Sequence, residues 1–427
     1  MLTQILSKFG VKPFYGWSVL AGLFFVYAAS NGVLMHTVPL LYPELIREFG
    51  WTEAQVTLPA TMLYVVGAFT SPPAGVLLDR YSPRRIVIAG ACGIVVGLLL
   101  TAGFKVLWQL VAIFILFGTA LSLCGLVSNM LILTRWFHRL RGKATGILLM
   151  ASSLGGVVFP LFMGWGLMNW GWRPTLVGFA VLVAVMMLVP LLFVIKDRPQ
   201  DLGLEVDGRL AVDAPSTNGS GSHGPTLRDA IRDRNFYLIA LATGSVWFAI
   251  IALIQNQSIY LGRDLGVSGP VLSVIFSTFF ACSVIGKFGF GFLSDYFQKD
   301  RVMMVSVLLL IGGLLLLKSA DVTQTTSLFA YAAVAGVGFS GAFTCVQLMI
   351  ATHYAGPSYG KILAIMMLMD TLAGALGTRV IATMRGNFGS YEPAFNLLML
   401  VCVFAIACIA LLRTSSTPAL GLQSAVE

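Results

Sequence analysis

Long apolar runs, separated by short clusters of charged and turn-forming residues, limit most strongly how this chain can fold. Most of the runs are near 20 residues or longer, and a helix needs about 20 apolar residues to cross a bilayer. Lipid offers the backbone no hydrogen-bond partner, so only helices and closed barrels cross it, and continuous runs do not fit the short alternating segments of a barrel. The twelve predicted spans are 15–45, 54–78, 86–104, 107–135, 143–168, 174–195, 236–261, 270–294, 302–317, 325–353, 361–384 and 392–412.

The composition agrees with a protein that lies mostly in lipid. Hydrophobic residues make up 57% of the chain and charged residues 11%, whereas a soluble domain has roughly 25% charged residues. We therefore predict an all-α polytopic membrane protein with twelve transmembrane helices in two pseudo-symmetric six-helix bundles. All 6 cysteines fall within apolar runs and none forms a CxxC motif, so we expect no metal site and no cofactor.

One polar stretch divides the chain. Residues 196–235 contain the segment DAPSTNGSGSHGP, whose Gly, Ser and Pro content is typical of a flexible linker. We expect an N-terminal six-helix bundle in 1–195, a cytoplasmic linker in 196–235, a C-terminal six-helix bundle in 236–413 and a cytoplasmic tail in 414–427.

The distribution of Lys and Arg predicts the orientation in the membrane. With the N-terminus inside, 19 of these residues lie on the cytoplasmic side and 6 outside, while Lys287 and Arg379 lie within spans. Cytoplasmic loops carry the excess of positive charge, so both termini and the linker are expected inside. The net charge of +9 then reflects basic loops, and no nucleic-acid partner is expected. Residues 1–13 do not resemble a cleavable signal, and we expect a multi-pass protein of the cell (inner) membrane that works as a monomer.

Two loops repeat the same pattern at equivalent positions of the two halves. The first reads GVLLDRYSPRR from Gly75, and the second reads GFLSDYFQKDR from Gly291. Glycine permits close approach of a neighbouring helix, and the aspartates lie at helix C-termini, where the helix dipole disfavours them. We therefore expect each aspartate to have a partner, either a helix N-terminus or an arginine. The predicted cytoplasmic gate consists of Gly75, Asp79, Arg80, Arg84, Gly291, Asp295 and Arg301.

These loops resemble the GxxxDrxGrr signature of the major facilitator superfamily. The segment WFHRLRGKATGILLMASSLGG, from Trp136 to Gly156, is similar to the motif leading into helix 5 of monocarboxylate porters and oxalate/formate antiporters. FYGWSVL, from Phe14, partly resembles the helix 1 entry of that group without its acidic residue, and DRPQDLGLEVDG, from Asp197, resembles the segment after helix 6 in bacterial members. The resemblance implies two repeated bundles that carry a small solute by alternating access.

Lys287 is the most unusual residue within a span. It lies in the apolar run from Val271 to Leu293, which has no other charged residue, and a charge at such depth costs about 2.5 kcal/mol or more. The similar porters carry there, four residues before the glycine of the loop signature, an arginine that binds the substrate carboxylate. The resemblance thus implies an anion site at Lys287, with lysine as a point charge in place of a bidentate fork. The alternative is partial snorkelling towards the interface.

Asp370 is expected to lie at a similar depth in another helix. It follows Lys361 by nine residues, which corresponds to about 13 Å, while Lys287 lies about 12 Å from Asp295. An isolated carboxyl in a dry site favours its protonated form, so Asp370 is the predicted proton-coupling residue. The alternative is a structural ion pair with Lys287.

Polar residues in other spans complete the predicted substrate site. His36 can titrate in the physiological range, although a lone intramembrane histidine is often only a hydrogen-bonding strut. Each neutral residue has an alternative role as interhelical hydrogen-bonding partner, worth about 0.6 kcal/mol. Arg379 is expected to reach the outer headgroups or to guard the external mouth. The predicted substrate-binding residues are Lys287, His36, Asn31, Asn129, Gln255, Asn256, Gln347 and Tyr331.

The function predicted from these features is secondary active transport of a small organic anion, specifically a monocarboxylate moved with a proton. The alternatives are an anion exchanger of oxalate/formate type, a proton-coupled exporter of hydrophobic compounds, and a sensor built on a carrier scaffold. No P-loop, HExxH or GxSxG motif occurs in the chain, so neither ATP-driven transport nor an enzyme is expected.

Overall fold

The structure is a computed structural model that describes residues 14–138, 140–204, 227–320, 325–354 and 359–412. Every regular element in these ranges is helical, and 12 helices are long and apolar enough to cross a membrane. Helices satisfy their own backbone hydrogen bonds, which a lipid environment requires. The predicted all-helical class with twelve spans is therefore confirmed, and the protein is a multi-pass membrane protein.

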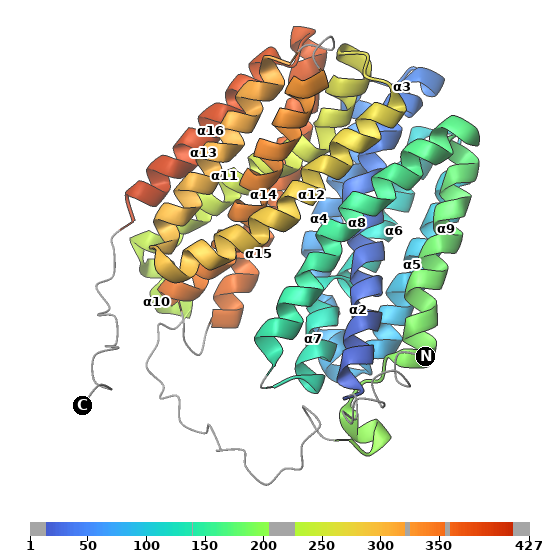
Figure 1. The fold of residues 1–427 in the computed structure, drawn as a ribbon, viewed down its shortest axis with the longest axis vertical. Helices are drawn as coiled ribbons and strands as arrows, with labels where there is room; N and C mark the ends of the chain where they lie inside the picture. Colours follow the sequence, from blue (N-terminus) through green and yellow to red (C-terminus); the bar gives the residue numbers. More distant parts are fainter. Residues whose placement is uncertain (1–13, 139, 205–226, 321–324, 355–358, 413–427) are drawn as a thin grey trace.

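The first half of the chain, before the predicted linker, forms one group of helices, drawn in blue to green in Figure 1. In chain order its α-helices are α2 (Gly16–Asn31), α3 (Tyr42–Phe49), α4 (Glu53–Arg80), α5 (Pro83–Gly103), α6 (Leu107–Cys124), α7 (Leu126–Trp136), α8 (Arg141–Asn169) and α9 (Trp172–Val189).

The second half forms the group drawn in yellow-green to red. Its α-helices are α10 (Leu227–Arg232), α11 (Arg234–Ile259), α12 (Gly269–Tyr296), α13 (Lys299–Lys318), α14 (Thr325–Tyr354), α15 (Tyr359–Phe388) and α16 (Glu392–Ala410). The span predicted to be shortest, 302–317, extends in the structure to Lys299–Lys318.

Four predicted spans are not single α-helices: the sixth and seventh end in π-helical turns, Pro190–Val194 and Tyr260–Asp264, and the first and fourth are interrupted inside. In the first span, α2 gives way to a π-helical turn, Gly32–Thr37, and then to a 3₁₀ turn, Val38–Leu41. The fourth span is divided into α6 and α7 at Gly125, whose backbone is extended. Such interruptions within spans are tolerated where other groups satisfy the freed backbone atoms, and they occur frequently at functional sites.

Local signals fix the short helix α3 and the start of α4. Gly50 ends α3 with a positive φ of 66°, a conformation that glycine adopts without strain. Thr52 then caps α4 reciprocally with Gln55, in a capping box. Glu53 lies in the first turn of α4, where the helix dipole favours a negative charge.

The two halves meet along two pairs of helices, α8 with α12 and α4 with α15. We call the end of the molecule that holds α3 the α3 end, at the top of Figure 1, and the opposite end the α7 end. Residues 205–226 of the predicted linker and the predicted tail 414–427 lie outside the described residues. The division into domains therefore stays a prediction.

Candidate functional site

A central cavity of about 280 Å³ lies between the two halves. Its walls come from α2, α4, α6, α7 and α8 on one side and from α11, α12, α14 and α15 on the other. The polar and charged residues that line it are Tyr27, Asn31, His36, Tyr64, Ser71, Ser122, Ser152, Ser153, Trp247, Lys287 and Thr371. The structure thus brings together three of the predicted site residues, Asn31, His36 and Lys287.

Lys287 is half-buried at the wall of this cavity. Its ammonium Nζ lies 3.5 Å from the carbonyl oxygen of Leu149, to which it donates, and 4.8 Å from the centre of the Phe343 ring. Among the described residues no carboxylate lies within 4.0 Å of this nitrogen. The close packing of the preceding residue holds the lysine in place, because a Cβ on Gly286 would lie 3.1 Å from the backbone of Val337 in α14.

His36 lies on the π-helical turn of the first span, with 7% of the residue exposed. Its Nε2 is 3.4 Å from the hydroxyl of Ser152, and the edge of its ring meets Phe280 with 4.0 Å between ring centres. Its Nδ1 is buried and has no hydrogen-bond partner among the described residues. An unsatisfied buried polar atom of this kind is costly, so it marks a functional position better than a packing position.

Asp370 lines a smaller cavity of about 150 Å³ next to the central one. Its Oδ1 accepts a hydrogen bond of 2.7 Å from the hydroxyl of Thr243, and the residue is 4% exposed. Trp247 and Phe343 line both cavities. No ion pair joins Asp370 to Lys287 among the described residues, so the alternative of a structural pair does not hold in this conformation.

Gln255 joins the two halves between the central cavity and the α3 end. The hydroxyl of Tyr42 donates to its Oε1 at 2.7 Å, and its Nε2 lies 2.9 Å from the hydroxyl of Tyr64. Gln255 is buried on α11, whereas both tyrosines belong to the first half. This predicted binding residue therefore serves as a polar closure above the cavity.

Three other predicted binding residues use their polar groups within the helix packing. The amide of Asn129 donates to the carbonyls of Cys124 and Gly125, both at 2.8 Å, and so satisfies carbonyls freed by the break between α6 and α7. The amide of Asn256 donates to the backbone of its own helix and of α15, and the hydroxyl of Tyr331 donates to Gln257. This geometry favours structural roles. Gln347, in contrast, lines the cavity that contains Asp370.

The predicted gate is only partly described. The side chains of Asp79 and Asp295 lie outside the described residues, and Arg80 and Arg301 are exposed. A Cβ on Gly75 or on Gly291 would meet nothing within 4 Å, so the predicted close helix approach is absent from this conformation.

Arg84 has a partner that the sequence did not predict. Its guanidinium donates to the carbonyls of Leu191 and Leu192, each at 2.6 Å, at the end of the sixth span. Asp197 accepts from the backbone N–H of Arg84 at 2.9 Å and from the hydroxyl of Ser82. These bonds tie the start of α5 to the chain after α9, within the first half.

At the α3 end, charged groups connect the halves. Arg263 of the second half forms an ion pair with Glu53 at the start of α4, and Arg379 donates to the carbonyl of Ala54. Arg379 was expected to reach the outer headgroups or to guard the external mouth, and its guanidinium reaches the first turn of α4, so it connects the halves at the α3 end. The neighbouring Asp264 holds Arg385 through two bonds of 2.8 and 2.9 Å.

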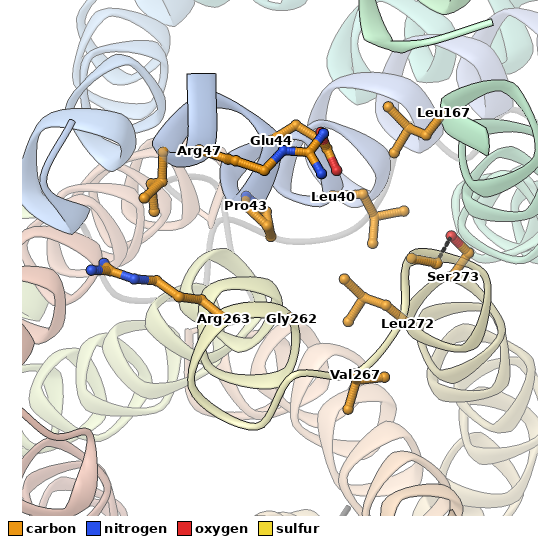
Figure 2. Close-up of a pocket in the computed structure, with 12 residues that line it drawn as sticks. Leu40, Pro43, Glu44, Arg47, Leu167, Gly262, Arg263, Val267, Leu272 and Ser273 are labelled. Atoms are coloured by element: carbon orange, nitrogen blue, oxygen red, sulfur yellow. Dashed lines mark hydrogen bonds and ion pairs between the residues drawn. The ribbon is translucent and has the colours of Figure 1, made fainter. Parts of the chain in front are cut away.

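Another cavity, of about 420 Å³, lies at the α3 end (Figure 2). Glu44, Arg47 and Arg263 line it, but Glu44 pairs with Arg47 and Arg263 pairs with Glu53. Its charges are therefore compensated. The central cavity, with an ammonium that has no described anionic partner, is better suited to bind a charged ligand.

Sequence reasoning missed Tyr27, Ser152 and Ser153 as cavity residues. The two serines belong to the Trp136–Gly156 motif, which carried the family resemblance. Ser153 accepts a hydrogen bond of 3.1 Å from Ser283 of α12, and Ser152 meets His36. A serine pair next to small residues in a motif helix was the available signal.

Twelve spans in two packed halves that enclose a cavity define a membrane transporter of the secondary type, and not an enzyme. The family model of the Major Facilitator Superfamily matches residues 19–255 and 236–427, so the chain belongs to this family. The matches overlap only near the start of the second half, as expected for a repeated architecture.

Several relatives and solved structures are similar to the chain. "Monocarboxylate transporter 13" of Bos taurus is 25% identical over 394 residues, which cover 89% of this chain and 85% of the relative. "Membrane sensor protein UhpC" of Salmonella typhimurium is 26% identical and covers 67% of each chain. A bacterial homologue of the human lysosomal transporter Spinster has a similar fold, with a TM-score of 0.70 at 18% identity, covering 94% of this chain and 96% of the other.

Proposed function

We propose that this transporter moves a small organic anion, specifically a monocarboxylate, together with a proton by alternating access. The observation that carries the proposal is the Lys287 ammonium at the wall of the central cavity, with no described carboxylate within 4.0 Å. A cation in largely apolar surroundings is costly unless an anion compensates it. The relatives named monocarboxylate transporters support the same substrate class.

In the proposed cycle Lys287 binds the substrate carboxylate, and Asn31, His36 and Ser152 contact its polar groups. The proton is carried by Asp370, whose one described hydrogen bond comes from the neutral donor Thr243. With both charges compensated, the halves are free to close around the substrate. The hydrogen bonds of Gln255 with Tyr42 and Tyr64 then break as the α3 end opens and form again as it closes.

The orientation and the gate belong to the same proposal. The excess of Lys and Arg supports a cytoplasmic α7 end, with both termini inside the cell membrane, and a single chain contains the whole proposed pathway. Asp79 and Asp295 are proposed to close the α7 end in the opposite conformation, together with the arginines of their loops. The exposed Arg80 and Arg301 are available for such contacts.

Uptake into liposomes tests the proposal. We expect labelled carboxylates from the set lactate, pyruvate, formate, oxalate and phenylacetate to accumulate faster with an inward proton gradient. Lys287→Ala should lower this uptake at least about 30-fold, because a buried charge contact is worth about 2–5 kcal/mol. Lys318→Ala is the matched control, since Lys318 pairs with Glu392 at 3.0 Å at the end of α13, away from the cavities, and should transport normally.

Other outcomes separate the alternatives. Carboxylate uptake that persists in Lys287→Ala would rule out the anion site at this lysine. Exchange of oxalate for formate that ignores the proton gradient would favour the exchanger. Proton-driven efflux of hydrophobic compounds, without carboxylate transport, would favour the exporter, and substrate binding without any transport would favour a sensor.

A further inference from the structure

The space around Lys287 is larger than a one- to three-carbon acid requires. A third cavity, of about 250 Å³, also begins at Lys287 and continues along α8 and α14 past Thr344 and Gln347. Phe343 lines this cavity, the central cavity and the cavity of Asp370. Pockets of about 300–1,000 Å³ generally hold molecules of drug size. The central cavity alone, at about 280 Å³, approaches that size, so formate or lactate would leave most of it unfilled.

Polar residues line the central cavity from several helices, among them Asn31, Tyr64, Ser71, Ser122 and Thr371, but three groups form a cluster. Lys287, His36 and Ser152 lie close together, since Ser152 meets His36 and Lys287 donates to Leu149 of the same helix as Ser152. These groups suit a carboxylate head. Ser153 lies next to them and is held by Ser283.

One wall beside this cluster is aromatic and aliphatic. Trp247 and Phe343 form an edge-to-face pair with 5.8 Å between ring centres, and Ile251 and Met367 lie beside them around both cavities. The Lys287 ammonium also lies over the face of the Phe343 ring. This wall offers the apolar body of a ligand a surface to pack against, and burial of apolar area favours binding.

We propose that the substrate is a monocarboxylate with a bulky apolar or aromatic body, bound with its carboxylate at Lys287 and its body against Trp247 and Phe343. This inference rests on the proposed function, because it assigns the substrate class of the same site. It goes further in one respect: the apolar body, and not only the charge, selects the substrate. Trp247 and Phe343 are the specificity-determining residues.

Calorimetric titration of the full chain in lipid nanodiscs tests the substrate class directly. The ligands are acetate, lactate, butyrate, hexanoate and phenylacetate, with phenylacetamide as the neutral counterpart of the last. Each buried methylene should tighten binding about fourfold, so hexanoate should bind far better than acetate. Phenylacetate should bind better than lactate, and phenylacetamide at least tenfold more weakly than phenylacetate.

The outcomes distinguish this inference from the proposed function. Tight binding of acetate and lactate with weak binding of hexanoate and phenylacetate would overturn the inference and leave carboxylate transport standing. Equal affinity along the acid series would do the same. Binding of phenylacetamide as tightly as phenylacetate, or no binding of any acid, would overturn both.

Substitutions test whether Trp247 and Phe343 determine which substrate binds. Trp247→Leu and Phe343→Leu should weaken phenylacetate binding at least fivefold while acetate binding changes less than twofold. Lys287→Gln should weaken both acids by a similar factor. Phe292→Leu is the matched control, because Phe292 is exposed on the same helix as Lys287 and should change neither. Loss of phenylacetate and acetate affinity in equal measure in the wall variants, with folding confirmed by gel filtration, would contradict the assignment.

Discussion

At the scale of single residues, the oppositely charged Lys287 and Asp370 lie near the same two aromatic side chains. Lys287 faces the central cavity, whereas Asp370 faces the smaller one, and Phe343 and Trp247 line both. The two charged groups do not form an ion pair among the described residues. Each is therefore free to take a separate partner, the lysine an anion and the carboxyl a proton.

The separation of these roles gives a prediction for Asp370→Asn. The amide keeps the shape of the side chain and its contact with Thr243, but it cannot exchange a proton. Monocarboxylate affinity should therefore stay within about threefold, while stimulation of uptake by an inward proton gradient disappears. Parallel measurements of binding and of gradient-driven uptake in liposomes check this.

The matched control for that measurement is Asp300→Asn. Asp300 lies at the start of α13 and pairs with His353 at 3.6 Å, away from the cavities. Its variant should keep the response to the gradient. Gradient-driven uptake that survives in Asp370→Asn would show that another group carries the proton.

At the scale of helices, the tight contact between α12 and α14 positions the lysine. A Cβ on Gly286 would lie 2.0 Å from the Ser340 hydroxyl as well as close to the backbone of Val337. Gly286→Ala should therefore destabilise the protein by about 1–3 kcal/mol, in spite of the better helix propensity of alanine. Thermal unfolding in detergent measures the stability, and anion affinity should fall because Lys287 moves with its helix.

Gly289 provides the comparison on the same helix. A Cβ there would meet nothing within 4 Å, so Gly289→Ala should leave the melting temperature unchanged or raise it. Equal melting temperatures for the two alanine variants would mean that the contact between α12 and α14 gives way without cost.

The same scale shows what could be predicted from the sequence. Apolar run length identified all the spans, because crossing lipid sets a minimum length that few other constraints disturb. It missed the π-helical turn at Gly32–Thr37 and the break at Gly125, because the residues that mark them, Asn31-Gly32, Pro39 and Gly125, stand singly inside apolar runs that are long enough to cross the membrane as one helix. When a helix is apolar on all sides, its sequence does not indicate which face lines the cavity. For that reason Lys287 and His36 were separated correctly from lipid, while Asn129 and Tyr331 were given binding roles that their hydrogen bonds do not favour.

At the scale of the whole molecule, the ion pair between Glu53 and Arg263 bridges the halves at the α3 end. Opening of this end must break it, so removing it should favour the opened state. The Arg263 side chain is 44% exposed, and a pair so accessible is worth about 1 kcal/mol or less. Glu53→Gln should therefore raise the population open at the α3 end by up to about fivefold.

Labelling of a cysteine introduced at Leu40, which lines the α3-end cavity, measures this population in a background without native cysteines. Glu48→Gln is the control, because Glu48 pairs with Arg173 at 2.6 Å at the same end but within one half. If labelling is unchanged in Glu53→Gln, or rises equally in Glu48→Gln, then contacts other than the ion pair between Glu53 and Arg263 keep this end closed.

The break between α6 and α7 adds an electrostatic consequence. Ser128 and Asn129 donate to the carbonyls of Leu123, Cys124 and Gly125, so the negative end of α6 is compensated locally. The first residues of α7 line the central cavity, and the start of a helix carries about half a positive elementary charge. Unlike the ammonium of a lysine, this backbone charge cannot be lost at alkaline pH. An anion entering the protein therefore meets a permanent attraction built into the main chain.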